Sequence, residues 1–317
     1  MVAKIFIDGE AGTTGLQIRE RLAGRRDLEV LSIAADKRKD QDERKRLLNA
    51  ADVAILCLPD EAAKESVSLI DNGTTRVIDA STAYRVDPDW TYGFAEMDKG
   101  QTEAIAKARF VANPGCWPQG LIAGLRPLIA AGLVPADFQA IYHGISGYSG
   151  GGKQMIAEYE AEGGTPSQFM PYGLTFAHKH LPEMTAYTGL KSAPLFQPVV
   201  GNFAQGMTTS IPLQLGTFAK VPTGAEIHAA LADYFAAIPD SFVRVAAYDP
   251  ALGKTAALDP QAHNGTNTLT LHVFANDSRA QAAILAVYDN LGKGASGAAV
   301  QNLNLMLGVS ASESLAA

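Results

Sequence analysis

Blocks of apolar residues alternate with polar, helix-like segments along the first third of the chain. Lys4–Asp8 is a short β-branched run that ends at a glycine, and Thr14–Leu22 then carries apolar residues among charges. Val53–Leu58 is a continuous apolar run, Glu61–Ile70 is helix-like, and Arg76–Asp79 is again strand-like. Continuous apolar strands that alternate with helices predict a parallel sheet covered on both faces.

Further elements extend this alternation toward the middle of the chain. We expect another strand at Leu28–Ala35, a charged segment at Lys37–Asn49, a strand at Phe110–Ala112 and an apolar helix at Gln119–Ala131. After about Pro135 the pattern changes.

Glycines cluster at Gly147–Gly152 in the second half, and the strand-like runs Ser210–Gln214 and Thr268–Phe274 are longer and partly alternating. Such runs are typical of an open α+β layer. The last segment, Ala280–Val309, is expected to begin as a helix, to break at Gly292–Gly297 and then to resume. We expect it to return to the first domain, because an apolar carboxyl-terminal helix needs a face to bury against.

The chain has 317 residues, of which 47% are apolar, and it exceeds the size at which one core usually splits into two. We therefore expect a Rossmann-type doubly wound α/β domain formed by residues 1–117 with 290–317. Residues 118–289 are expected to form an α+β domain for substrate binding, catalysis and oligomerisation.

The charge balance, 33 acidic against 26 basic residues, argues against a nucleic-acid partner and favours a small molecule. Two cysteines cannot form a disulfide framework or a thiolate zinc site alone, which fits a reducing cytosol. The start of the chain is too short an apolar run for a secretory signal, and no run approaches the ~20 apolar residues of a membrane helix. We expect a cytoplasmic protein.

A glycine-rich turn directly follows the first predicted strand. Gly9, Gly12 and Gly15 have the G-x-x-G-x-x-G spacing, with Thr13 and Thr14 at the expected helix start. Glycines let backbone amides approach a pyrophosphate at the positive end of a helix. The spacing alone is weak, but its place at the first strand of an α/β domain favours dinucleotide binding.

The cofactor type is left open by the residues after the second strand. Asp36 lies where an acid would bind the ribose 2′-hydroxyl of NAD. Lys37, Arg38 and Lys39 follow at once, and such cations can neutralise the 2′-phosphate of NADP. A solvated charged turn would look the same.

Cys116 lies at the start of the predicted apolar helix, between Asn113–Pro114–Gly115 and Pro118. A helix start favours the thiolate, which is the reactive form of cysteine. Most single cysteines are small buried hydrophobes, and Cys57 fits that description. Proline and glycine around Cys116 instead predict a rigid exposed turn and a nucleophile.

His178 and His180 are two residues apart and can converge on one site, with histidine the usual proton shuttle near neutral pH. The H-x-H pattern with Glu183 also allows a metal site. We rank that second, because Pro182 interrupts any helix or central strand and the surrounding pattern is not that of barrel strands.

Basic groups would bind a substrate that carries negative charge, and Arg85, which follows the hydroxyl-bearing turn at Ser81, is our first candidate for that role. The glycine-rich loop that begins at Ser146 and Gly147 has two readings. It is either a nest of free amides that holds phosphate or a flexible bend.

The motif Asn113–Pro114–Gly115–Cys116, followed by an aromatic residue and proline, resembles the nucleophile motif of the N-acetyl-gamma-glutamyl-phosphate reductase family, relatives of aspartate-semialdehyde dehydrogenase. The Gly-Thr-Thr-Gly turn resembles the shorter group of that family. Trp117 and Gln119 stand where tyrosine and threonine are more usual. The resemblance extends over nearly the whole chain and includes Asp79–Arg85, Ser146–Gly147, His178–Met184 and Asp289–Asn302.

The resemblance implies an NADP-dependent reductase that forms a thioester on Cys116 and releases an aldehyde. It implies proton transfer by His180, positioning by His178, cofactor contacts at Ser81 and Asn290, substrate contacts in the segment with Glu183, and a homodimer or homotetramer. The alternatives are aspartate-semialdehyde dehydrogenase, a nucleotide-independent cysteine acyltransferase or amidase, and a non-catalytic nucleotide sensor.

Overall fold

The computed structural model describes residues 2–163, 167–254 and 257–317. Within these ranges the chain forms two compact units. The first contains residues 2–95, 100–115 and 295–316, and the second contains residues 96–99 and 116–294. No helix among the described residues has the length and apolar character that a membrane crossing requires.

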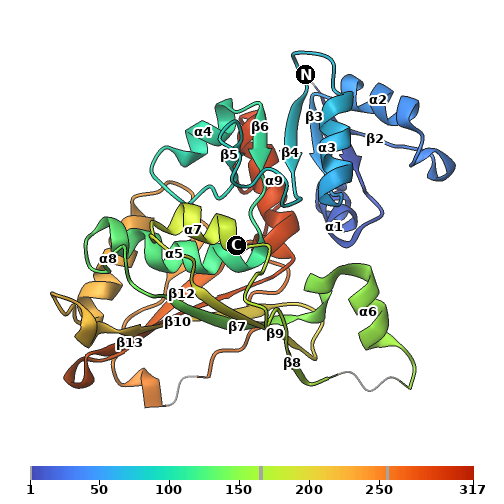
Figure 1. Ribbon diagram of the computed structural model, residues 1–317. Helices are drawn as coiled ribbons and strands as arrows, with labels where there is room; N and C mark the ends of the chain where they lie inside the picture. The colour runs from blue at the N-terminus through green and yellow to red at the C-terminus, as the bar shows by residue number, and fades with distance from the viewer. Residues whose placement is uncertain (1, 164–166, 255–256) are drawn as a thin grey trace. The chain divides into compact units, whose positions relative to one another are not determined.

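The first unit contains a six-stranded, wholly parallel sheet in the order β2-β1-β3-β4-β6-β5 (Figure 1). Helices lie between the strands in sequence, which confirms the predicted doubly wound α/β fold. The strands are β1 (Ala3–Asp8), β2 (Leu28–Leu31), β3 (Val53–Leu56), β4 (Arg76–Asp79), β5 (Thr91–Tyr92) and β6 (Phe110–Ala112). The helices are α1 (Thr13–Leu22), η1 (Ala35–Lys37), α2 (Gln41–Ala50), α3 (Asp60–Leu69), α4 (Gln101–Lys107) and α9 (Gly297–Leu307).

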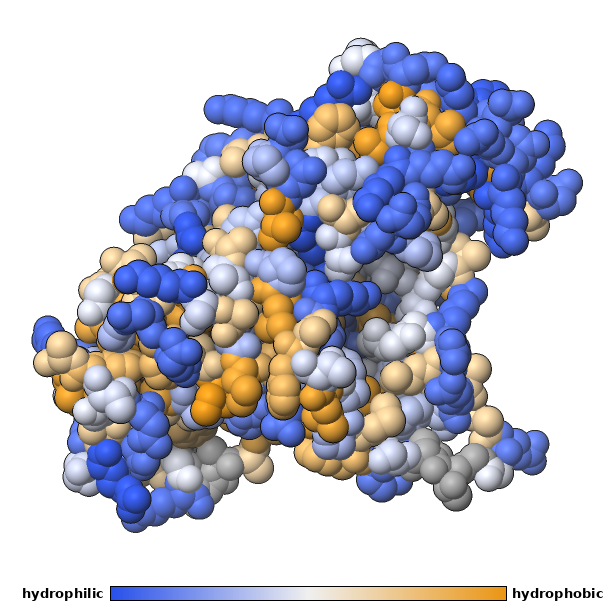
Figure 2. Space-filling view, in the orientation of Figure 1, coloured by the Kyte–Doolittle hydropathy of each residue, from blue (hydrophilic) through white to orange (hydrophobic). Residues whose placement is uncertain are grey.

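One face of this sheet is covered by α2 and α3. Phe6, Ala54 and Leu56 point to this face and pack with Leu47 and Leu48 of α2. The rest of α2 is rich in charged residues, and Figure 2 shows hydrophilic residues around an apolar patch in the region of α2 and α3. A helix with one apolar stripe is thus held on the sheet by burial of that stripe.

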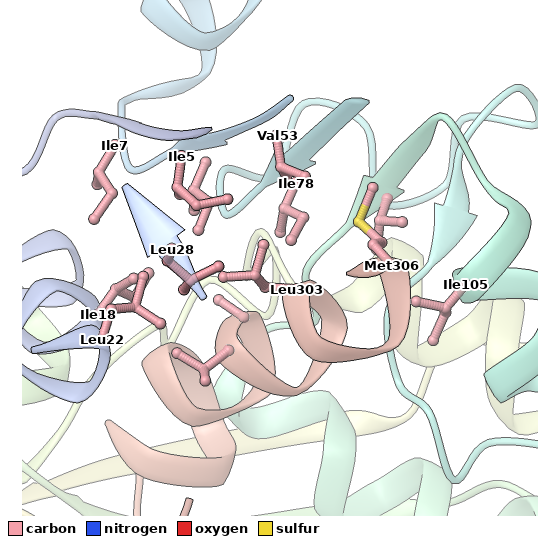
Figure 3. Packing of buried hydrophobic residues seen from close by; sticks show 14 of the residues in the cluster. Ile5, Ile7, Ile18, Leu22, Leu28, Val53, Ile78, Ile105, Leu303 and Met306 are labelled. Atoms are coloured by element: carbon pink, nitrogen blue, oxygen red, sulfur yellow. The ribbon is translucent and has the colours of Figure 1, made fainter. Parts of the chain in front are cut away.

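The opposite face is covered by α1 and α9. Ile5 and Ile7 alternate with Phe6 along β1, so they point to the other side and pack with Ile18 of α1 and Leu303 of α9 (Figure 3). The carboxyl-terminal helix α9 is therefore part of the core of the first unit, although most of the second unit precedes it in sequence.

The second unit contains a seven-stranded mixed sheet in the order β11-β12-β13-β10-β7-β9-β8. The strands are β7 (Ile141–Gly147), β8 (Phe169–Pro171), β9 (Leu195–Gly201), β10 (Met207–Gln214), β11 (Val243–Val245), β12 (Leu269–Asn276) and β13 (Gln281–Tyr288). The helices and helical turns are α5 (Cys116–Ala130), η2 (Tyr148–Gly151), α6 (Gly152–Glu160), α7 (Leu181–Thr188), η3 (Leu215–Thr217), α8 (Gly224–Ala236), η4 (Leu252–Lys254), η5 (Asp277–Arg279) and the π-helix η6 (Gly292–Ser296).

Helices α5, α7 and α8 gather on one face of this mixed sheet (Figure 1). Tyr142 and Ile211 point toward them and are fully buried. The side chains that alternate with these point to the other face, where Ile141 and Leu195 remain exposed. The second sheet therefore has one helix-covered face and one face that is partly open, since Ile141 and Leu195 are exposed there whereas Val287 is buried.

Three sequence predictions differ from the structure. The segment that starts at Ala280 begins with strand β13, not with a helix, because it pairs with both β10 and β12 and this tertiary pairing overrides the helix propensity of its alanines. The strand predicted for Leu28–Ala35 ends at Leu31. The glycine cluster at 147–152, predicted as a loop, contains the end of β7, the helical turn η2 and the first residue of α6.

Asp79 ends β4 with its side chain fully buried. The hydroxyl of Ser81 donates to Asp79 Oδ2 at 2.6 Å. Burial raises the pKa of Asp79 from 3.8 to about 6, against the opposing effects of the Ser81 bond and the Arg85 guanidinium. Since the folded pKa lies above the unfolded value, the stability linked to this group is fully present below about pH 4 and is lost as pH rises through about 6.

Asp79→Asn should remove this dependence, because the amide does not titrate. From pH 4 to pH 7.5 the free energy of unfolding of the unsubstituted protein should fall by up to about 3 kcal/mol relative to the variant. Denaturant unfolding at a series of pH values measures the difference. The exposed Asp89→Asn variant is the control, and its curve should run parallel to that of the unsubstituted protein. Parallel curves for Asp79→Asn would contradict the assignment.

Candidate active site

Cys116 is the first residue of α5, as the sequence predicted. Two buried tyrosines fix this helix start: the Tyr288 hydroxyl donates to the carbonyl of Cys116 at 2.7 Å, and the Tyr142 hydroxyl donates to the carbonyl of Trp117 at 2.7 Å. A Cβ at Gly120 would lie 2.6 Å from Thr209 Oγ1, so glycine lets the helix lie directly on the sheet. The nucleophile candidate is thus held by the strands beneath it.

An aromatic cluster connects the start of α5 to the histidine segment. The indole N–H of Trp117 donates to Tyr172 Oη at 3.0 Å, and the Trp117 ring meets Phe196 edge-on at 5.3 Å. Phe196 in turn meets His178 at 5.1 Å, and Tyr172 meets His178 at 5.9 Å. Trp117, which departs from the usual residue of the resembling family, is therefore part of the site.

His178 and His180 lie side by side, with ring centroids 4.7 Å apart. The backbone N–H of His180 donates to His178 Nδ1 at 3.1 Å, so a neutral His178 ring carries its proton on Nε2. His180 is buried and immediately precedes α7, whose first turn contains the buried Glu183. Among the described residues no three side chains of metal-ligating type gather at one point.

The backbone of Lys293 and Gly294 lies beside α5 and Cys116 in the second unit. Gln119 Nε2 donates to the carbonyl of Lys293 at 2.7 Å. A Cβ at Gly294 would lie 2.9 Å from Cys116 Cβ, so only glycine allows this approach. The sequence predicted a helix break at 292–297, but the structure has the π-helix η6 there, which leads directly into α9, and the contact with Cys116 had no local signal.

Asn290 is buried and holds two segments of the second unit together. Its Oδ1 accepts from Gly206 N at 2.7 Å and its Nδ2 donates to Ser149 Oγ at 3.0 Å. The amides of Gly147, Tyr148 and Ser149 donate to carbonyls of residues 203–206. These three amides are therefore paired with carbonyls and are not available for the phosphate nest of the first reading.

In the first unit, the glycine turn is required by close packing. Gly9 has φ +87°, and a Cβ there would lie 2.4 Å from the carbonyl oxygen of Cys57. A Cβ at Gly15 would lie 2.6 Å from the carbonyl oxygen of Gly9. Gly12 precedes α1, which begins at Thr13 and continues through Thr14, with no acidic residue in its first turn. An anion at this end meets a positive dipole and the first-turn amides.

A cavity of about 440 Å³ adjoins this turn, and its lining includes Glu10, Arg38 and Lys39. Arg38 donates to Glu10 at 3.3 Å, and Arg19 also pairs with Glu10. Lys37 lies in η1 and is absent from this lining. Glu10 was not singled out from the sequence, although an acidic residue between two glycines of such a turn could have indicated a basic partner nearby.

Arg85 and Ser81 lie after β4. The Arg85 side chain is buried and donates to the carbonyls of Asn113 and Ala80 at 3.0 and 3.1 Å. Ser81 Oγ donates to Asp79 and accepts from Ala83 N at 3.1 Å. The side chains of Arg85 and Ser81 therefore both make hydrogen bonds to residues at or just after the carboxyl ends of strands in the first unit.

The chain belongs to the semialdehyde dehydrogenase family. Residues 4–108 match the model described as "Semialdehyde dehydrogenase, NAD binding domain", and residues 116–290 match "Semialdehyde dehydrogenase, dimerisation domain". It is thus an oxidoreductase with a nicotinamide cofactor.

Relatives of high identity carry one name, N-acetyl-gamma-glutamyl-phosphate reductase. The protein from Chelativorans sp. is 65% identical over 307 residues, which cover 97% of this chain and 99% of the relative. That from Mesorhizobium japonicum is 64% identical, with 98% and 100% covered. Membership of the semialdehyde dehydrogenase family does not favour the alternative of a nucleotide-independent cysteine acyltransferase or amidase.

Solved structures show the same fold. Aspartate semialdehyde dehydrogenase II from Vibrio cholerae, solved in complex with ASA, has a TM-score of 0.70 at 14% identity and covers 97% of this chain and 98% of its own. The enzyme from Candida albicans, solved with NADP, has a TM-score of 0.67 at 14% identity, with 97% and 99% covered.

The two cysteines differ in environment. Burial of the Cys57 thiol, with the carboxylates of Asp79 and Asp8 nearby, raises its pKa to about 12. At pH 8 roughly one Cys57 in 10⁴ is then a thiolate. Neither cysteine is in a disulfide.

Iodoacetamide at pH 8 should therefore label Cys116 and leave Cys57 unmodified in the folded protein. Peptide mass spectrometry after timed quenching identifies the labelled residue. Cys57→Ala should not change the extent of labelling, whereas Cys116→Ser should abolish it. Comparable labelling of both thiols would contradict the nucleophile assignment.

Proposed function

We propose that this chain reduces N-acetyl-L-glutamyl 5-phosphate to N-acetyl-L-glutamate 5-semialdehyde with NADPH. The observation that carries the proposal is Cys116 at the first residue of α5 in a chain 65% identical to a reductase of that name. In this proposal residues 1–117 with 290–317 bind the dinucleotide, and residues 118–289 bind substrate and support catalysis.

The Cys116 thiolate attacks the acyl carbonyl carbon, a C–S bond forms, and the C–O bond to phosphate breaks. The product is a thioester, which is still reactive toward hydride. NADPH supplies that hydride when bound. The resulting oxyanion takes a proton, and the thiohemiacetal then releases the aldehyde and regenerates the thiolate. Backbone amides at the start of α5 are the groups that would stabilise the oxyanion.

His180 gives and removes the proton in this scheme, and His178 positions it. The bond from His180 N to His178 Nδ1 supports this division, since it ties the His178 ring to the backbone that carries His180. Arg85, Ser146, Gly147 and Glu183 remain our candidates for substrate contacts.

For the cofactor, we infer NADP. The amides that follow Gly9 and Gly12, with Thr13, Thr14 and Gly15, would hold the pyrophosphate, and Arg38 would bind the 2′-phosphate. Lys37 stays a candidate for a second contact, although it is not part of the cavity lining. The cavity beside the turn, lined by Arg38, supports this assignment. Ser81 and Asn290 remain candidates for contacts to the nicotinamide end.

We also infer that the protein is a homodimer or homotetramer. The open face of the seven-stranded sheet, with Ile141 and Leu195 exposed, supports an interface there, because monomers rarely expose large apolar patches. The matching family model is described as a dimerisation domain.

Cys116→Ser should lower turnover by roughly 10⁴-fold or more, because the hydroxyl is a far weaker nucleophile than the thiolate, while NADP affinity stays within about twofold. Turnover is followed in the reverse direction, as phosphate-dependent reduction of NADP with N-acetylglutamate semialdehyde. Cys57→Ala is the matched control and should retain activity. If kcat/KM is higher for aspartate semialdehyde than for N-acetylglutamate semialdehyde, the chain is instead an aspartate-semialdehyde dehydrogenase.

Arg38→Ala should weaken NADP binding about tenfold to a hundredfold, through loss of charge-assisted hydrogen bonds to the 2′-phosphate. NAD binding should change little, because NAD lacks that phosphate. Titration of each dinucleotide into the protein separates the two effects. An equal loss for both would mean that Arg38 does not read the 2′-phosphate.

A further inference from the structure

A fully buried ion pair lies in the second unit, outside the groups that the proposed reaction uses. Lys293 Nζ and Glu96 Oε2 are 2.6 Å apart, and each side chain is only 1% exposed. The other oxygen of Glu96 accepts from Phe242 N at 3.1 Å, and the ammonium lies 5.8 Å from the centre of the Phe242 ring. Burial lowers the pKa of Lys293, and the Glu96 carboxylate opposes that shift.

Such a pair is costly to bury, because both charges lose their hydration. A hydrophobic pair of similar volume would often give equal stability, so stability alone does not account for it. Its position does. Lys293 is the second residue of the π-helix Gly292–Ser296, and helical segments of this kind occur often at functional sites.

The backbone of this π-helix touches the nucleophile. Gly294 approaches Cys116 so closely that a Cβ there would lie 2.9 Å from Cys116 Cβ. The carbonyl of Lys293 accepts from Gln119 Nε2 at 2.7 Å, and Gly294 N donates to the carbonyl of Asp289 at 2.9 Å. The side chain of Lys293 therefore anchors the same two residues whose backbone packs against α5 and its first residue.

We propose that Lys293, through its ion pair with Glu96, is a positioning residue for Cys116: it holds the backbone of Gly294 against the nucleophile and so fixes the direction of the thiol. This rests on the proposed role of Cys116 as the nucleophile. Loss of the anchor lets the 292–296 backbone shift, and a shift of about 1 Å at reacting atoms costs on the order of a hundredfold in rate.

The test compares Lys293→Met, Glu96→Gln and the double variant in the full-length protein. Two properties are measured: the pH profile of Cys116 alkylation by iodoacetamide, and kcat and KM of the phosphate-dependent reaction. Each single substitution should lower the alkylation rate and kcat about tenfold to a hundredfold, with KM for NADP unchanged. Lys64→Met, which breaks the surface pair of Lys64 with Glu61, is the control and should change neither property.

The double variant separates positioning from stability. It leaves no unpaired buried charge, so its thermal stability should recover relative to Lys293→Met, while alkylation and kcat stay low. Recovery of kcat together with stability would overturn the proposal, as would an unchanged alkylation rate in any of the three variants. If Lys293→Met does not fold, Glu96→Gln and the double variant give the answer.

The alkylation measurement needs neither substrate nor cofactor. It therefore tests the positioning role even if the chain reduces a different acyl phosphate. Failure of the substrate assignment would appear instead as low activity of the unsubstituted protein with N-acetylglutamate semialdehyde, with its alkylation profile intact.

Discussion

The start of α5 is the point on which the second unit and its chemistry depend. Residue 116 is the first residue of the helix, and it is also where the chain enters the long segment that builds the second unit. Hydroxyls from two buried tyrosines, on β7 and β13, hold the first two carbonyls of the helix. The helix start cannot shift on the sheet without breaking both bonds, so the thiol candidate is placed by the sheet and not by a loop.

In the first unit, the glycine turn is the place where we propose that backbone amides approach the pyrophosphate of the cofactor. A Cβ at Gly9 or Gly15 would lie less than 3 Å from backbone atoms of neighbouring residues, so the absence of a side chain allows this close packing. Charge is then balanced locally, since Glu10 pairs with Arg38 and Arg19 at the edge of the same turn. In both units, small residues let backbone approach where the chemistry is proposed, and ion pairs fix the segments that approach.

Most of the parallel sheet could be predicted because its strands are continuous apolar runs bounded by glycine, proline or charge. Arg76–Asp79 and Phe110–Ala112 have the predicted bounds, and the glycine turn and the helix start at Cys116 were found from local patterns. Other contacts have no local signal in the sequence. Lys293 pairs with Glu96, almost two hundred residues away, and the side-chain amide of Asn290 both accepts from Gly206 N and donates to Ser149 Oγ. They depend on the tertiary fold, which brings distant segments together.

The segment of β13 was wrongly predicted to be a helix, and the physical reason for this also concerns the assembly of the protein. A half-buried strand is recognised by apolar and polar residues in alternation, but here the outward positions, Ala283, Leu285 and Val287, are as apolar as the inward Ala282, Ile284 and Ala286. A strand that is apolar on both faces is typical of a sheet covered on both sides. Within the described chain the α-helices α5, α7 and α8 cover one side of this sheet and leave exposed apolar residues such as Ile141 and Leu195 on the other, so the apolar outward positions of β13 support a second copy on that side.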